Sequence, residues 1–143
     1  MKNLFFLTII LLLSGLVING CGGSEDTAKS DQELIQGVWA GNAVGIETEF
    51  TMTISGNNFN METTDSEVFY KGTFVLNEKV TPKQADFKMD DCNIEEYIGT
   101  TARAIYKIEN DTLTIASNEP RNEIRPTVFE GSDQTQVFTL KKQ

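Results

Sequence analysis

Apolar and polar residues alternate along most of the chain after residue 36. Phe50, Met52 and Ile54 alternate with polar residues between positions 48 and 55, which is the pattern of a β-strand with one buried face. Seven further segments show the same alternation, namely the stretch that starts at Gly37-Val38-Trp39 and residues 59–62, 68–76, 85–89, 102–109, 113–115 and 137–140. The pattern therefore predicts eight strands.

Short turn sequences separate these segments, for example Gly56-Asn57-Asn58 and Asn110-Asp111. Glycine and asparagine tolerate the backbone conformations of tight hairpins. Regular spacing without a helical pattern predicts an antiparallel barrel or sandwich. We favour an all-β, eight-stranded antiparallel up-and-down barrel, because closure removes exposed strand edges; an open sandwich is the alternative. Gly72 interrupts residues 68–76 and indicates a bulge or sharp bend.

The first twenty residues have a different character. Lys2 precedes an apolar run from residue 4 to residue 18, which has the length of an export signal and is short for a membrane span. Ile18-Asn19-Gly20-Cys21 resembles the bacterial lipobox, which implies cleavage before Cys21 and its lipidation. Several acyl chains give a stable anchor, so we expect an exported lipoprotein of the cell envelope, at the outer membrane. A secreted protein or an uncleaved helix is the alternative.

Residues 22–30 carry no apolar side chain larger than alanine, and we expect residues 21–32 to form a flexible linker after Cys21. Ser30 and Glu33 match a capping box, which predicts one helical turn through Leu34 and Ile35. We expect this turn to cover the end of the barrel beside Trp39, the only tryptophan. The barrel domain is then residues 33–143.

The chain is acidic, with a net charge of −9 that becomes −10 when removal of residues 1–20 takes away Lys2. Such a surface repels phosphate backbones, so the charge argues against nucleic-acid binding, and attachment to the membrane must come from the lipid. Acidity keeps an exported protein soluble, and it also suits a basic protein partner.

Candidate catalytic and metal-binding residues are few. The chain has no histidine, which removes the commonest general base and zinc ligand, and Cys92 lacks the partner of an activated thiol. Asp90, Asp91, Glu95 and Glu96 form the densest acidic cluster. These carboxylates could hold calcium or serve as a glycosidase pair, but they match no calcium-loop spacing and do not predict opposed positions. A solvated loop is favoured, and the sequence predicts no enzyme, metal site or cofactor.

Three later motifs resemble a bacterial family of lipocalin-like domains, whose best-known branch is the Planctomycetes uncharacterised domain. They are Thr81-Pro82-Lys83-Gln84-Ala85-Asp86, residues 104–115 with Tyr106-Lys107-Ile108, and Arg125-Pro126-Thr127-Val128-Phe129. Together with Gly37-Val38-Trp39 they span the chain from about Leu34 to its end. The resemblance implies a barrel fold and no established activity. It also implies that Trp39 packs against a basic residue, which could be Lys141, Lys142 or Arg125, and strand alternation favours Lys141.

Seven aromatic or methionine side chains could line an apolar pocket or fill the core: Phe50, Met52, Phe59, Met61, Phe74, Phe87 and Tyr106. A barrel of this size favours a filled interior or a small cavity. The first functional hypothesis is a lipid-anchored module that binds a small apolar ligand. The alternative is an acidic interaction or inhibitor protein that binds a basic envelope partner such as a lysozyme.

Overall fold

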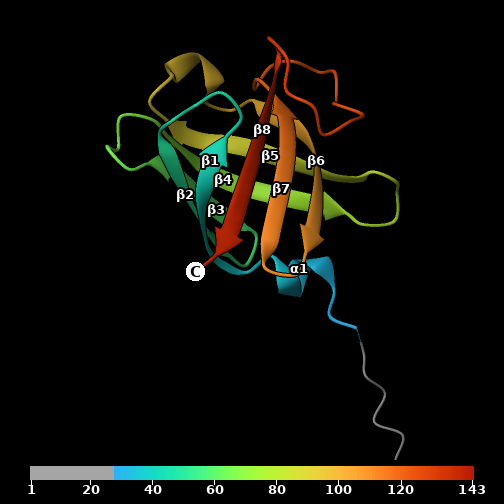
Figure 1. Ribbon diagram of the computed structural model, residues 1–143. Coiled ribbons are helices and arrows are strands. Elements are labelled where there is room, and N and C mark those ends of the chain that lie inside the picture. The colour runs from blue at the N-terminus through green and yellow to red at the C-terminus, as the bar shows by residue number, and fades with distance from the viewer. Residues whose placement is uncertain (1–27) are drawn as a thin grey trace, which may run out of the picture.

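Each of the eight alternating segments forms a strand in the computed structural model, which describes residues 28–143 (Figure 1). The elements are α1 (Asp31–Leu34), β1 (Gly37–Ala43), β2 (Glu49–Ser55), β3 (Asn58–Thr63), β4 (Phe69–Asn77), β5 (Lys83–Cys92), the 3-10 turn η1 (Glu95–Tyr97), β6 (Thr101–Glu109), β7 (Thr112–Asn118) and β8 (Thr135–Lys142). The predicted export signal and Cys21 lie outside the described residues.

The strands form one closed antiparallel barrel in sequence order. β1 pairs with β2 on one side and with β8 on the other, so the chain's first and last strands meet. This closure confirms the predicted up-and-down barrel and excludes the open sandwich. Connections alternate between two ends: α1 and the C-terminus lie at one, which we call the closed end, and the long β7–β8 loop lies at the other, the open end (Figure 1).

The strand faces follow the period-two pattern. Phe50, Met52 and Ile54 of β2 are buried, as predicted, while Thr53 and Ser55 are exposed. The pairing of β4 with β5 shifts register at Gly72, which confirms the predicted bulge. A β-carbon at that position would collide with the carbonyl oxygen of Lys88, so the close strand approach requires glycine.

A helical turn closes one end of the barrel, as the capping box predicts. The Ser30 side chain accepts from the backbone N–H of Glu33, and the Glu33 carboxylate accepts from Ser30. Gly37, at φ +114°, turns the chain from α1 into β1. The indole nitrogen of Trp39 then donates to the carbonyl oxygen of Ile35 at 2.7 Å, and both side chains are fully buried. The helix begins two residues before the predicted domain boundary at residue 33.

The basic residue beside Trp39 is Lys142, and the prediction of Lys141 is wrong. The Lys142 ammonium lies 5.1 Å from the centroid of the indole ring and donates to the carbonyl oxygen of Leu34. Lys142 stands directly opposite Trp39 across β1 and β8, and directly opposite residues share a sheet face. Lys141 is one residue out of phase and donates outside the barrel to Thr112.

Arg125 is not a partner of Trp39 either. Its guanidinium donates to the carbonyl oxygens of Ala85 and Ala104 at 2.9 and 2.6 Å, and to the carboxylate of Asp86 at 2.6 Å. It therefore holds the β7–β8 loop against the neighbouring strands β5 and β6. Phe129 of the same motif packs on an outer cluster made of Ile105, Ala116 and Val137.

A buried carboxylate completes the closed end. Asp31 of α1, with its side chain 8% exposed, accepts from the Lys83 ammonium and from the Tyr106 hydroxyl, both at 2.6 Å. Burial, and then the hydrogen bond to Asp31, raise the pKa of Tyr106 far above its ordinary value. The ion pair links α1 to β5 and the tyrosine hydrogen bond links α1 to β6, and the alternation pattern predicts neither contact.

Candidate functional site

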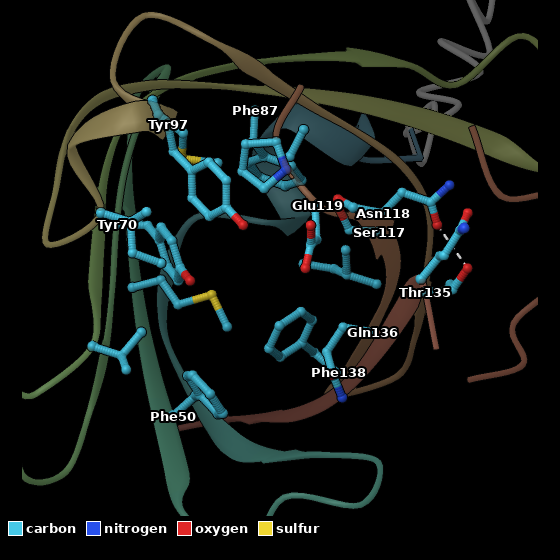
Figure 2. A pocket seen from close by; sticks show the side chains of 18 of the residues that line it. Phe50, Tyr70, Phe87, Tyr97, Ser117, Asn118, Glu119, Thr135, Gln136 and Phe138 are labelled. Carbon is cyan, nitrogen blue, oxygen red and sulfur yellow. Dashed lines mark hydrogen bonds between the residues drawn. The ribbon is translucent and has the colours of Figure 1, made fainter. Parts of the chain in front are cut away.

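The open end contains a cavity with a volume of about 380 Å³. It lies among the inner faces of the strands and the loops that connect them at this end (Figure 2). Its apolar lining comprises Ile46, Phe50, Met52, Phe59, Met61, Val68, Tyr70, Phe87, Met89, Ile94, Tyr97, Ala102, Ile115, Pro120 and Phe138. The polar remainder is Ser117, Asn118, Glu119, Ser132, Asp133, Gln134, Thr135 and Gln136.

Five of the seven predicted pocket residues line this cavity: Phe50, Met52, Phe59, Met61 and Phe87. Aromatic pairs fix its walls. Phe50 meets Phe138 edge to face at 5.3 Å between ring centroids, and Phe59 meets Phe87 at 5.2 Å. Such contacts add about 0.5 to 1.5 kcal/mol beyond the burial of area, so they stabilise the walls of the cavity.

The predictions for Phe74 and Tyr106 are wrong. Both face the barrel interior, but neither lines the cavity. Phe74 packs behind Phe87, with ring centroids 5.9 Å apart, and Tyr106 binds Asp31 at the closed end. Each lies four residues along its strand from a lining residue, Tyr70 or Ala102, which is about 13 Å of extended chain. Alternation gives the face of a strand residue but not its height in the barrel.

Two tyrosines and a glutamate place polar atoms in the cavity. The hydroxyls of Tyr70 and Tyr97 and the carboxylate of Glu119 point into the same space (Figure 2). Burial raises the pKa of Tyr70, with the neighbouring Tyr97 adding to the effect. Burial, and then the negative charge of Glu119, raise the pKa of Tyr97. Both hydroxyls therefore remain neutral hydrogen-bonding groups at neutral pH.

Sequence reasoning missed several lining residues. Tyr70 and Met89 could have been found, because Tyr70 shares its strand face with Phe74 and Met89 shares its face with Phe87. Phe138 likewise alternates with the buried Val137 and faces inward. Tyr97 and Glu119 lie outside the strands, where no periodicity places a side chain.

The loops at the open end are acidic. The four connections at this end, residues 44–48, 64–68, 93–100 and 119–134, carry nine carboxylates and two arginines: Glu47, Asp65, Glu67, Glu95, Glu96, Glu119, Glu123, Glu130 and Asp133 against Arg121 and Arg125. The three turns at the closed end, residues 56–57, 78–82 and 110–111, carry only Glu78, Lys79 and Asp111. Negative charge is therefore concentrated around the cavity mouth.

The acidic cluster from Asp90 to Glu96 does not converge. β5 continues to Cys92, so Asp90 and Asp91 lie in a strand and not in the predicted loop. Glu96 pairs with Arg121 at 2.8 Å. Cys92 is buried, and its thiol donates to the carbonyl oxygen of Ile94. Within residues 28–143, no group of three or more Cys, Asp or Glu side chains is placed to hold a metal ion.

Comparisons with protein-family models, with curated proteins and with solved structures find no match for this chain. In the part of the chain that the structure describes, no helix is long and apolar enough to cross a membrane. The resemblance to lipocalin-like lipoproteins stays a prediction from the sequence motifs.

Proposed function

We propose that this chain is a lipid-anchored, lipocalin-like protein of the cell envelope that binds a small apolar ligand in the open end of its barrel. The anchor rests on the apolar run and Cys21 in the sequence. The observation that carries the binding function is the cavity of about 380 Å³, whose lining is mainly aromatic, aliphatic and methionine side chains. Concave, largely apolar sites with a few polar groups are typical of small-molecule binding.

Blocking the cavity tests this function. The full chain, as its host produces it, is placed in nanodiscs and titrated with the neutral fluorescent reporter N-phenyl-1-naphthylamine. Ser117→Trp puts a large ring into the cavity and Ala102→Leu enlarges a second lining side chain, whereas Val75→Trp puts the same ring on an outer position that is 71% exposed. We expect saturable binding that the two blocking variants weaken at least about tenfold.

Val75→Trp serves as the control and should bind the reporter as the unmodified protein does. Circular dichroism establishes that each variant is folded. Equal reporter binding in the unmodified protein and in both folded blocking variants would contradict the proposed site, because the signal would then come from the lipid or from the outer surface.

The acidic loops favour a second candidate function, which is binding to a basic envelope protein such as a lysozyme. Complementary charge speeds association and makes binding sensitive to salt. Binding of lysozyme to the full chain should weaken steeply as salt rises, and Ser117→Trp should leave it unchanged because the ring enters the cavity and not the loop surface. Salt-independent binding, or no binding at low salt, would exclude this candidate.

A further inference from the structure

We propose that the cavity selects a single-chain cationic amphiphile, an apolar chain with an amine head, over the matching alcohol or carboxylate. This inference rests on the proposed function, because it names the class of ligand that the same cavity takes. It follows from the charges, the hydrogen bonds and the aromatic groups that surround the polar part of the cavity.

The charged groups of the lining have one sign. Of the described residues that line the cavity, Glu119 and Asp133 are the charged ones, and neither Lys nor Arg is among them. Two unit charges a few ångströms apart interact more strongly near a protein surface than in bulk water. A ligand carboxylate would meet repulsion here, whereas an ammonium group would be attracted.

The two arginines of the surrounding loops are occupied elsewhere. Arg121 donates to Glu96 at 2.8 Å, and Arg125 binds Asp86 and two carbonyl oxygens on the outer side of β5 and β6. Neither belongs to the lining. A bound carboxylate would therefore lack the cationic partner that a buried anion requires.

Two amide groups at the cavity wall already donate to backbone carbonyl oxygens. The side-chain nitrogen of Asn118 donates to the carbonyl oxygen of Ile124 at 2.8 Å, and that of Gln136 donates to the carbonyl oxygen of Val44 at 2.9 Å. The Thr135 hydroxyl donates to the Asn118 side-chain oxygen at 2.6 Å (Figure 2). These three donors are thus engaged within the protein, while the carboxylates of Glu119 and Asp133 offer acceptors to a head group that donates.

Aromatic rings add a second attraction for a cation. Tyr70 and Tyr97 flank the space into which Glu119 points, and Phe50 and Phe138 form the opposite wall (Figure 2). A cation within about 6 Å of the face of such a ring is attracted to it. The carboxylate, the neutral tyrosine hydroxyls and the ring faces together form a site for an ammonium group above an apolar chamber.

A set of three probes with one chain length tests this selectivity: decylamine, decanol and decanoate. Each competes with N-phenyl-1-naphthylamine for the full chain in nanodiscs, and displacement that also occurs with the Ser117→Trp variant is subtracted. We expect decylamine to bind at least about tenfold more tightly than decanoate, with decanol between them. Added salt should narrow the difference, because the site is open at its mouth.

Charge-removing variants assign the effect to the lining. Glu119→Gln combined with Asp133→Asn should weaken decylamine binding about tenfold and decanol binding much less. Glu130→Gln, an exposed residue of the same loop outside the lining, should change neither. The proposed selectivity is overturned if decanoate binds as tightly as decylamine, or if the double variant does not weaken decylamine binding. In either case, binding of decanol would still support the proposed function. Failure of the reporter and all three probes overturns both.

Discussion

At the closed end a four-residue helix fills the opening of the barrel, whereas at the open end four loops surround a cavity of about 380 Å³. The two ends use similar side chains in opposite ways. Trp39 and Tyr106 are fully buried and hydrogen-bonded at the closed end, while the hydroxyls of Tyr70 and Tyr97 face the cavity at the open end (Figure 2). The buried contacts of the closed end stabilise the barrel, and the proposed ligand site lies at the open end.

The largest expected difference between the two ends is in how much one aromatic ring contributes to the free energy of unfolding. Trp39→Ala removes a fully buried ring and its hydrogen bond to Ile35, and should lower the free energy of unfolding by about 3 to 5 kcal/mol. Tyr97→Ala removes a partly exposed ring at the cavity mouth and should cost less than about 1 kcal/mol. Denaturant unfolding of both variants measures the difference, and equal losses would remove the distinction between the ends.

A smaller effect is expected for the buried hydroxyl at the closed end. Tyr106→Phe takes one of two donors from Asp31, and should lower the free energy of unfolding by about 1 to 2 kcal/mol at neutral pH. The pH dependence of the free energy of unfolding tests the role of Tyr106 more specifically. The pKa of Tyr106 is raised on folding, so above about pH 10 the unfolded state releases a proton that the folded state keeps.

Stability should therefore fall as the pH rises above about 10, by up to about 1.4 kcal/mol per pH unit for this group. Unfolding free energies measured on either side of about pH 10 should show a shallower decline for Tyr106→Phe. A slope remains, because the pKa values of Tyr70 and Tyr97 are also raised. Identical slopes in the two proteins would show that Tyr106 is not the buried titrating group.

The smallest expected effect is the difference in stability between variants of two adjacent lysines. Lys142→Gln loses the cation over the Trp39 ring and the bond to Leu34, and should lower the free energy of unfolding by about 1 kcal/mol. Lys141→Gln changes only an exposed contact with Thr112 and should be close to neutral. Thermal unfolding compares the pair, and a larger loss for Lys141→Gln would reverse the assignment.

Most of the barrel was predictable because alternation depends only on the sequence. The period of Phe50, Met52 and Ile54 gives a strand and its inner face, and the Ser30 and Glu33 capping box gives the helical turn. The choice between Lys141 and Lys142 failed because it required the register of β1 on β8. Register depends on the closure of the whole barrel, which no local pattern specifies.

The cavity was predictable only in part for a related reason. The alternation identifies Phe59, Phe74 and Phe87 as inward-facing, but the height of each ring depends on how the strands are staggered. Glu119 and Tyr97 reach the cavity from loops. Asp31 meets Tyr106 only because the helix folds back under the barrel. These positions follow from tertiary packing and leave no periodic signal in the sequence.

The NMR signals of methionine report on the open end of the barrel, and those of tryptophan report on the closed end. The three methionines of the barrel, Met52, Met61 and Met89, all line the cavity, and the only tryptophan, Trp39, lies at the closed end. In the chain labelled at its methionine methyl groups, saturation with decanol should shift all three methyl resonances of the barrel and leave the Trp39 indole N–H resonance in place. Unmoved methyl resonances, or an indole shift as large as theirs, would contradict a ligand cavity confined to the open end.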